Sequence, residues 1–547
     1  MARHSFTAHR PVAMGTRGMV ASAHALASLA GLKMLMDGGN AVDAAVATAA
    51  ALNVVEPFMS GMGGVGIMLF HQAKNGVTQT LNFGGRAPDA ARPELFDAQS
   101  KQVGIRAPMV PGNLAGWLEA LEKHGTMSRE KVFTPAIEYA ERGVPMTHFG
   151  HRIWEDNAAK LRQCPYAAAT YLIDGRVPAP GEILRQPDLA RTFRKIVEQG
   201  KGVFYEGEIA HAIADFCAAE GGLIALKDLR DYQPVWQDVI ATDYRGYTVC
   251  TAPPNSEGFQ MLETLNILEA FDLASMPHNS AEYLHLLIEA VKIAAADRIA
   301  YAGDPDWCDV PIAGLLSKAY AAERRKLINR KKANVVAGER WVKDVPEGAI
   351  KAGNAREYLP KGTTHFCIVD AEGNAVSITQ TLGGGFGCGR VVPGTGIALN
   401  NGINWMEIDP ACDTPNLIAG GKRAAWCLSP MQVFRDGKLF LAIGTPGSYG
   451  ILHTTLQMFL NIVEFGANVQ EAIEAPRVRI YGGTNVEMEE RIPADVRDAL
   501  TQMGHTIHLL PAWSPVVGGG HGIMVHPISG AYLGGADPRR DGCAMGW

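Results

Sequence analysis

The chain has 547 residues, 47% of them hydrophobic and 19% charged, which is enough to bury a large core and to form more than one domain. A formal charge of −6 and a pI near 6.3 argue against a general nucleic-acid or membrane-surface binder. Nine cysteines are spread without a C-x-x-C pair or a metal-like Cys/His spacing. We therefore expect free thiols, a reducing compartment, no metal and no cofactor.

The N-terminal stretch "GMVASAHALASLAGLKMLM", residues 18–36, could be mistaken for a signal peptide. However, His24 and Lys33 interrupt the apolar run, and its leucines recur at near-helical spacing, which predicts an amphipathic first helix. Asn40 is expected to cap a second helix over residues 41–55 that is too short and too polar to cross a membrane. We therefore expect a cytoplasmic protein with no membrane partner.

A glycine-rich hexapeptide follows, "GMGGVG" at residues 61–66, and it fits the dinucleotide-binding pattern G-x-G-x-x-G. That pattern needs a strand before it and a helix after it, whereas here a helix-like run precedes it and the strand-like "IMLF" follows. The glycines are therefore expected to let two backbone segments pass close to each other rather than to bind a nucleotide.

The middle of the chain predicts helices over residues 187–200, 206–222 and 280–303, because apolar residues recur three and four apart and each segment runs into glycine. The basic run at 324–332 is interpreted as a solvated helix end. Residues 330–362 lack periodicity and carry many charges and glycines, which indicates an exposed connection.

Beyond this connection the hydrophobic period changes to two. Residues 364–370 and 374–381 alternate around the turn signal "AEGN", which predicts a hairpin. Further strands are expected at 396–401 and 438–444, and helices at 454–466 and 469–478 return afterwards. Strands grouped with helices on either side predict an α+β fold with a layered sheet core.

Two adjacent threonines open the predicted hairpin, directly after Gly362. Thr363 and Thr364 could simply start a strand, because β-branched residues suit strands. A threonine can also be a nucleophile when its own α-amine, freed as a chain terminus, takes the hydroxyl proton. Such an amine titrates at roughly 7.7 to 8.0, close to working pH. An enzyme of this kind must first cut its own chain before Thr363.

Blocks spread from about residue 18 to the final "GADPRRDG" resemble, in order, the γ-glutamyltranspeptidase family of N-terminal-nucleophile hydrolases. They include "GGNAVDAAVATAAAL", "VPGNLAGWLEALEKHGTM", "DYRGYTVCTAPPNSEG", "ADRIAYAGDPD", "TTHFCIVDAEGNAVSITQT", "GTGIALNNGINW" and "IGTPGSYGI". The resemblance implies a four-layer αββα sandwich with a helix-rich large-subunit part. It also implies a precursor that cleaves itself between Gly362 and Thr363. The large chain, 1–362, and the small chain, 363–547, would stay associated as one intertwined domain, with a dimer of these as a further option.

The resemblance also assigns the chemistry residue by residue. Thr363 matches the nucleophile, and Thr381 matches a second threonine whose hydroxyl assists cleavage and catalysis. Gly447 and Ser448 in "TPGSYG" stand where the family has two glycines whose backbone N–H groups form the oxyanion hole. Serine supplies the same N–H, so this function is expected to survive.

The substrate side departs from the family pattern. Where relatives carry an arginine this chain has Gly84, with Arg86 two places on, and tryptophans or small residues replace other polar groups. The candidate substrate contacts are Arg86, Gly383, Trp405, Trp426 and Cys427. Most groups that would recognise a glutamyl amine and carboxylate are therefore missing, and the two tryptophans favour a smaller or more apolar pocket.

The leading hypothesis is an N-terminal threonine amidohydrolase that acts on a small carboxylate-bearing amide, as oxamate amidohydrolases of the family do, with Arg86 as carboxylate partner. Three alternatives remain open at this point. They are γ-glutamyl hydrolysis or transfer on glutathione-like substrates, a cephalosporin-type acylase, and an inactive binding or structural protein. The intact Thr363, Thr381 and "TPGS" argue against the last of these.

Overall fold

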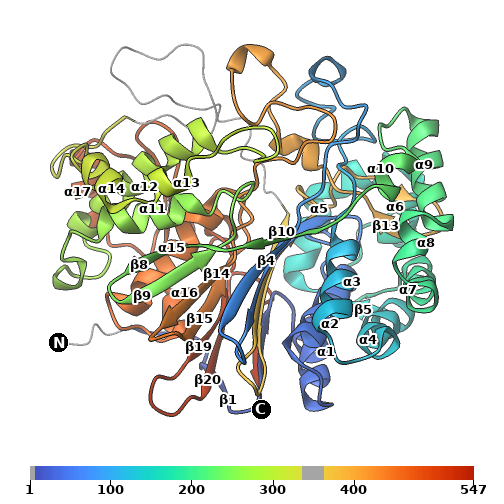
Figure 1. The fold of residues 1–547 in the computed structure, drawn as a ribbon, viewed down its shortest axis with the longest axis horizontal. Helices are drawn as coiled ribbons and strands as arrows, with labels where there is room; N and C mark the ends of the chain where they lie inside the picture. The colour runs from blue at the N-terminus through green and yellow to red at the C-terminus, as the bar shows by residue number, and fades with distance from the viewer. Residues whose placement is uncertain (1–5, 336–361) are drawn as a thin grey trace.

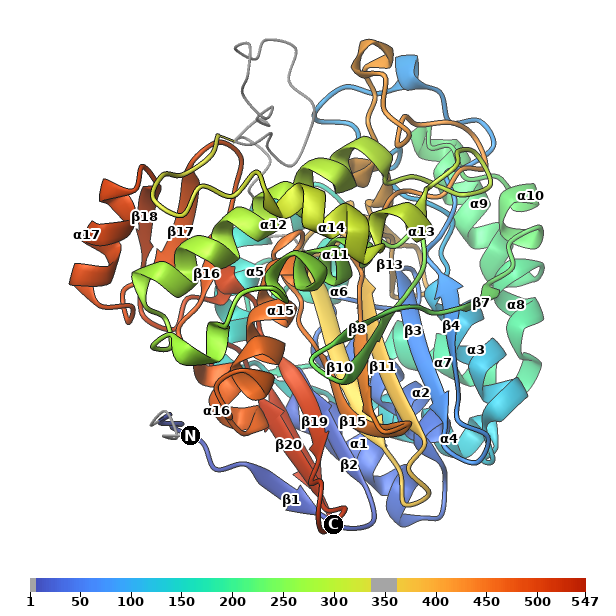
Figure 2. The same ribbon diagram turned by 60° about the vertical axis from the view of Figure 1, so that its left-hand side comes forward.

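The computed structural model describes residues 6–335 and 362–547. Two seven-stranded antiparallel sheets stack face to face between two layers of helices, as Figures 1 and 2 show. The four-layer αββα sandwich expected from the resemblance is confirmed. The connection predicted over 330–362 lies mostly outside the described residues.

The first sheet, here the β10 sheet, has the order β21-β2-β10-β11-β3-β4-β7. Its strands are β21 (Cys543–Gly546), β2 (Met19–Ser22), β10 (Thr363–Val369), β11 (Ala375–Thr381), β3 (Val65–Gln72), β4 (Val77–Phe83) and β7 (Val235–Asp238). Strands from both sides of position 363 are thus interleaved: β2 lies between β21 and β10, and β3 pairs with β11. The two halves of the chain share one hydrogen-bonded sheet.

The second sheet, here the β15 sheet, has the order β1-β20-β19-β15-β14-β9-β8. Its strands are β1 (Ala13–Gly15), β20 (Tyr532–Ala536), β19 (His521–Val525), β15 (Lys438–Gly444), β14 (Met431–Arg435), β9 (Tyr247–Thr251) and β8 (Ile240–Tyr244). This sheet also combines early and late parts of the chain.

Each sheet carries its own helical layer. The helices on the β10 sheet side include α1 (Ala25–Met36), α2 (Ala41–Val55), α3 (Asn113–His124), α4 (Arg129–Arg142), α7 (Pro187–Gln199) and α9 (Glu208–Glu220). Those on the β15 sheet side include α11 (Phe259–Leu268), α12 (Ala281–Tyr301), α15 (Gly450–Val463) and α16 (Val469–Glu474). Within the described residues, none of the helices combines the length and the apolar character that crossing a bilayer requires.

The two faces of β10 point into different cores. Phe366 and Ile368 pack into the core under the helices, whereas Cys367 and Val369 pack into the core between the sheets. Because successive side chains of a strand alternate, Thr364 shares the helical face and Thr363 shares the face toward the second sheet. This alternation separates the two candidate threonines.

Most expected elements are confirmed. The three central helices appear as α7, α9 and α12, and the predicted hairpin is β10–β11 in unbroken register from Thr363↔Thr381 to Val369↔Ala375. Asn40 caps α2 as predicted, in a reciprocal pair with Asp43. The three helices agree with their periodicity because each buries an apolar face against a neighbouring helix: α7 against α4, α9 against α8 (Lys201–Tyr205), and α12 against α11.

Two expectations were wrong in detail. The segment 18–36 is not one helix, because Met19–Ser22 forms β2 between β21 and β10, and α1 begins only at Ala25. The strand expected at 396–401 is reduced to Ile397–Ala398. Asn400 leaves the ladder because its side-chain amide bonds the backbone of Gly63 and Met109.

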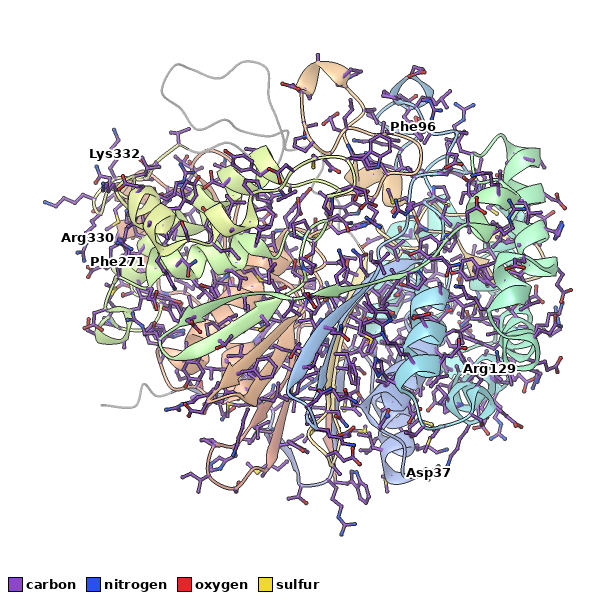
Figure 3. The ribbon with its side chains drawn as sticks, viewed as in Figure 1. Asp37, Phe96, Arg129, Phe271, Arg330 and Lys332 are labelled. Atoms are coloured by element: carbon purple, nitrogen blue, oxygen red, sulfur yellow. The ribbon has the colours of Figure 1, made fainter. Side chains whose placement is uncertain are left out.

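The basic run 324–332 begins in the last turn of α14 (Lys318–Arg325) and continues along the surface, where Arg330 pairs with Glu282 and packs over Phe271 (Figure 3). Both members of this ion pair are more than half exposed. Such a pair is screened by solvent and contributes little to stability. The interpretation of this run as a solvated helix end is confirmed.

Candidate active site

Thr363 and Thr381 face each other across β10 and β11, and the Thr363 hydroxyl donates to Thr381 Oγ1 at 3.2 Å. The Thr381 hydroxyl in turn donates to the carbonyl oxygen of Gly362, and Gly383 N–H donates to Thr381 Oγ1 at 2.7 Å. Thr381 therefore bridges the predicted nucleophile and the carbonyl of the bond that it would cut. A donor on that oxygen would stabilise the negative charge that develops during attack.

Gly383 holds this arrangement through its backbone. Its φ is +94°, and a Cβ at this position would lie 2.2 Å from Asn401 Oδ1. Asn401 uses the same oxygen to accept the N–H of Gly384 at 2.7 Å. A side chain at position 383 would not fit without moving Asn401, so this position contributes its N–H to the site. Asn401 was not predicted, although its place in "LNN" was a usable signal.

The glycines of "GMGGVG" make close backbone approaches, as expected. A Cβ on Gly63 would lie 2.1 Å from Ala398 O, and one on Gly64 would lie 2.4 Å from Thr381 O. The hexapeptide comes between α2 and β3, so the helix precedes the strand. These glycines therefore let the chain pass directly behind Thr381.

Gly447 and Ser448 form the turn between β15 and α15, with φ values of +139° and +59°. Their carbonyls accept the N–H groups of Gly450 and Ile451 at the start of α15. Where β15 ends, a Cβ on Gly444 would lie 2.4 Å from the His365 ring, two residues from Thr363. The turn therefore leaves the β15 sheet beside the start of β10. A helix N-terminus favours developing negative charge at this place.

His365 lies on the Thr363 face of β10 but is not a base for it. Its ring nitrogens contact Thr379 Oγ1 at 2.9 Å and Cys367 Sγ at 3.2 Å. Burial, together with the nearby His521, lowers the pKa of His365 well below its usual value. The imidazole therefore stays neutral and committed to its partners, which leaves the α-amine of a cleaved Thr363 as the candidate base.

Thr364 faces the opposite side, toward the end of α2. Glu56 lies there, and burial raises the pKa of its carboxyl to about 8, against the opposing effects of Arg540 and of the Thr364 hydroxyl. The sequence reasoning missed Glu56, although an acidic residue that ends an alanine-rich buried helix was a signal. Thr364 therefore lacks the contact with Thr381 that distinguishes Thr363.

The predicted tryptophans lie together. Trp405 and Trp426 have ring centroids 5.5 Å apart, and Trp405 meets Tyr449 at 5.3 Å. Tyr449 directly follows Ser448, so these three rings, here called the aromatic wall, adjoin the predicted oxyanion hole. A cavity of about 40 Å³ opens against Trp405 and Tyr449. Cys427 is buried next to Trp426 in the chain.

Arg86 is already paired. Its guanidinium donates to Gly421 O at 2.9 Å and to Asp306 at 3.1 Å, with its side chain 31% exposed. Arg423 bonds the same carboxylate at 2.9 Å. Burial acts to raise the pKa of Asp306, but the two arginines together outweigh it, so this pKa is lowered. A substrate carboxylate would have to join or displace Asp306 to reach Arg86.

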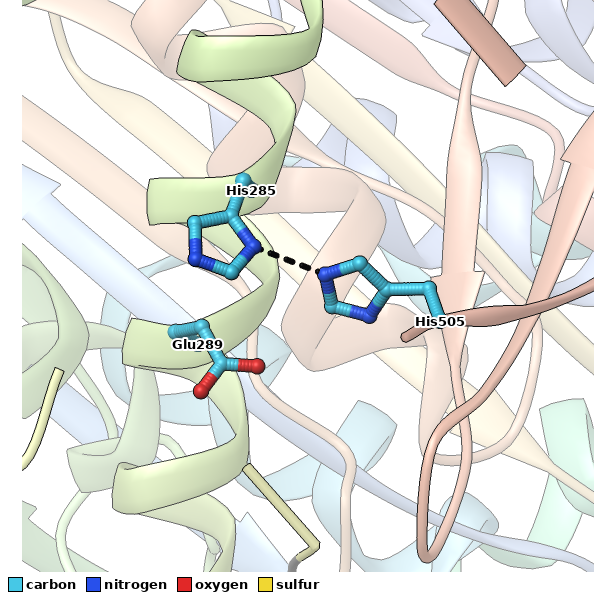
Figure 4. A group of neighbouring side chains, drawn as sticks. All are labelled: His285, Glu289 and His505. Atoms are coloured by element: carbon cyan, nitrogen blue, oxygen red, sulfur yellow. Dashed lines mark hydrogen bonds between the residues drawn. The ribbon is translucent and has the colours of Figure 1, made fainter. Parts of the chain in front are cut away.

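Among residues 6–335 and 362–547, one His/Cys/Asp/Glu group is compact enough for a metal ion: His285, Glu289 and His505, shown in Figure 4. His285 and His505 bond each other at 2.8 Å. Lys292 already provides a cation at Glu289, at 2.9 Å. A second cation would be repelled there, so we interpret the group as a buried polar contact that holds the nearby segment 329–334, where Asn334 N–H also bonds Glu289.

Comparison with known proteins agrees with this geometry. The family model described as gamma-glutamyltranspeptidase matches residues 27–547. The Acylase ACY 1 proenzyme of Pseudomonas sp. strain SE83 is 38% identical, over 98% of this chain and 95% of the relative. The glutathione hydrolase proenzyme of Bacillus subtilis strain 168 is 36% identical, over 99% and 93%.

A solved structure has the same fold as this chain. The cephalosporin acylase from Bacillus halodurans superposes with a TM-score of 0.89 at 33% identity, and the match covers 100% of this chain and 99% of that one. Both the sequence relatives and this fold neighbour thus extend over nearly the whole chain. The chain belongs to the γ-glutamyltranspeptidase family and is a self-processing hydrolase of amide bonds.

Proposed function

We propose that Thr363 is the nucleophile, and that the chain hydrolyses amides of small acids other than γ-glutamyl compounds. The observation that carries the first part is the Thr381 hydroxyl, which touches both Thr363 Oγ1 and Gly362 O. Thr363 Oγ would attack the Gly362 carbonyl carbon, the C–N bond to Thr363 would break, and water would hydrolyse the ester. The products are a Gly362 carboxylate and a free Thr363 amine.

The same groups then serve the substrate. The Thr363 amine takes the hydroxyl proton, Oγ attacks the amide carbonyl, and the N–H groups of Gly447 and Ser448 would receive the oxyanion. The amine returns the proton to the leaving nitrogen, and water releases the acid from the acyl-enzyme. The large chain 1–362 and the small chain 363–547 would stay together through the β2–β10 and β3–β11 ladders.

The choice of substrate rests on the aromatic wall and on the missing polar groups. A glutamyl group needs partners for an ammonium and a carboxylate, and each would cost about 1 to 3 kcal/mol or more if buried without one. Gly84 and Gly383 offer no side chain, and Arg86 is paired with Asp306. A small acyl group needs none of these partners. A carboxylate-bearing group such as oxamate would require Arg86 to shift toward it.

The test is a substrate panel on self-cleaved protein, with oxamate, short N-acyl amides, glutaryl amides and γ-glutamyl anilides. We expect the short amides to be turned over best and glutathione to be a poor substrate. A kcat/KM for γ-glutamyl anilide in the ordinary enzyme range, roughly 10⁴ M⁻¹s⁻¹ or above, would reject this proposal in favour of a glutathione hydrolase. That alternative is supported by the 36% identity to the Bacillus subtilis enzyme.

A further inference from the structure

The segment "LGGGFGCG" at residues 382–389, here called the glycine loop, directly follows Thr381 and reaches both sides of the cleavage site. Gly383 N–H donates to Thr381 Oγ1 at 2.7 Å. On the other side, a Cβ on Gly362 would lie 2.9 Å from the carbonyl oxygen of Gly384. The glycine loop therefore bonds the Thr381 hydroxyl and packs on the residue whose carbonyl that hydroxyl contacts.

A charged side chain from a distant helix binds the far end of this loop. Lys160 lies in the last turn of α5 (His148–Leu161) and is partly buried. Its ammonium donates to the carbonyl oxygens of Gly385 and Gly387, the second at 3.3 Å. Its stem covers Gly389, where a Cβ would lie 2.6 Å from Lys160 Cγ. Three glycines of the loop thus contact this one lysine.

Phe386 fixes the middle of the glycine loop to the same helix. Its ring packs against Trp154 with centroids 4.8 Å apart, and its N–H donates to Phe58 O at 3.0 Å. Trp154 and Lys160 both belong to α5. One helix therefore holds the loop through an apolar contact and through a charged one.

The Lys160 ammonium depends on the loop carbonyls in turn. Burial lowers the pKa of Lys160 to about 8, against the opposing effect of the neighbouring Cys388. Burial also raises the pKa of the Cys388 thiol to about 12, so this thiol supplies no negative charge at neutral pH. Taking an ammonium out of water is costly unless it is hydrogen-bonded. The ammonium and the carbonyl oxygens of the loop therefore hold each other in place.

We propose that Lys160 is a positioning residue for self-cleavage, whose ammonium holds the glycine loop against Thr381 and Gly362. This inference rests on the proposed function, in which Thr363 attacks the Gly362 carbonyl. A displacement of about 1 Å in a reacting group can slow a reaction by about 10²-fold. After cleavage the loop still bonds Thr381, so Lys160 should also support the rate of amide turnover rather than the binding of substrate.

The experiment follows self-cleavage of purified precursor over time on denaturing gels. Lys160→Met keeps the stem but removes the ammonium, and it should slow self-cleavage by about 10-fold or more. Lys160→Arg keeps the cation and should recover much of the rate. Lys195→Met is the matched control, because Lys195 pairs with Glu208 on the surface, and this variant should cleave like the wild type.

Turnover by the matured variants separates positioning from substrate binding. It is measured with N-acetyl and γ-glutamyl p-nitroanilide, of which the one that the wild type hydrolyses faster is used. Lys160→Met should lower kcat and leave KM unchanged, because the loop lies on the side of the threonines. A raised KM with an unchanged kcat contradicts the inference, since it would place Lys160 at the substrate.

Chemical rescue covers the case in which Lys160→Met gives no folded precursor. Lys160→Ala is refolded with ethylammonium, which can donate to the loop carbonyls, or with tetramethylammonium, which has no N–H to donate. Self-cleavage should be faster with ethylammonium, and equal rates in the two salts overturn the inference. So does wild-type self-cleavage in Lys160→Met. Self-cleavage that persists in Thr363→Ala instead rejects the proposed function, whatever the Lys160 variants do.

Discussion

The two sides of the site differ in how they are built. The side with the proposed nucleophile is an antiparallel ladder, in which Thr363, Thr381 and Val65 lie in one row across neighbouring strands. The substrate side consists of loops, in which Trp426 meets Gly84 and Arg86 meets Asp306. A ladder fixes its side chains by register, whereas loop contacts are independent of one another. The substrate side can therefore differ from relatives while the chemistry is retained.

The largest effect on this comparison is expected from removing the proposed nucleophile. Thr363→Ala should abolish both self-cleavage and turnover, leaving one full-length band on a denaturing gel. Thr363 carries the hydroxyl that bonds Thr381, and Thr381 in turn donates to the Gly362 carbonyl oxygen. N-terminal sequencing of the wild-type small chain should begin Thr-Thr-His. Thr364→Val is the matched control, and it should still be cleaved, since Thr364 faces α2. A small chain that begins at His365 would contradict this assignment.

Thr381→Val should have the next largest effect. Valine keeps the shape of the side chain but cannot donate to Gly362 O or accept from Gly383 N–H. Losing one donor to a developing oxyanion typically slows a reaction by about 10²- to 10³-fold. Time courses of self-cleavage and of turnover should both slow on this scale. Thr381→Ser, which restores the hydroxyl, should recover most of the rate, and wild-type rates in the valine variant would make Thr381 an ordinary strand residue.

Arg86→Ala tests the substrate side without touching the ladder. If the true substrate carries a carboxylate that reaches this guanidinium, KM should rise about 10-fold or more while self-cleavage proceeds normally, because a charge-assisted hydrogen bond contributes about 1.5 to 3 kcal/mol. Arg86→Lys should be intermediate, since lysine keeps the charge but not the paired donors. An unchanged KM would restrict Arg86 to holding Asp306 and Gly421 in place.

The smallest effect is expected from Glu56 behind β10. Its pKa is raised from 4.5 to about 8 by burial, so the folded protein retains a proton that the unfolded chain has lost. Stability from this group is complete below about pH 4.5 and is lost as pH rises through about 8. Glu56→Gln cannot ionise, so its melting temperature relative to the wild type should increase from about pH 5 to about pH 9. Exposed Glu372→Gln is the control, and a pH-independent difference for Glu56→Gln would contradict the assignment.

The sequence was most informative where local pattern and tertiary contacts agree. Period-two alternation located the β10–β11 hairpin, and near-helical spacing located α7, α9 and α12. The glycines of "GMGGVG" make the close backbone approaches that the sequence predicts. One wrong detail was β2, because an apolar run of this length is compatible with a strand and with a helix until its partners β10 and β21 are known.

The substrate side could not be derived in the same way. The contact between Trp426 and Gly84 joins residues 342 positions apart, and neither residue carries a local signal for the other. Arg86 was predicted as a carboxylate partner, but the sequence could not show that Asp306 already occupies its guanidinium. Gly383 was treated as a lost side chain, whereas its left-handed φ and the oxygen of Asn401 explain why only its N–H is used.

The alternation of faces along β10 has a consequence for how faithfully the protein matures. A shift of the cut by one residue would present Thr364, whose side chain points into the helical layer next to Glu56, so the misplaced hydroxyl could not reach a carbonyl held on the other face. A shift by two would present His365, which has no hydroxyl at all. The alternation of side chains along one strand therefore restricts cleavage to the bond before Thr363. The chain should produce one homogeneous new terminus without help from another protease.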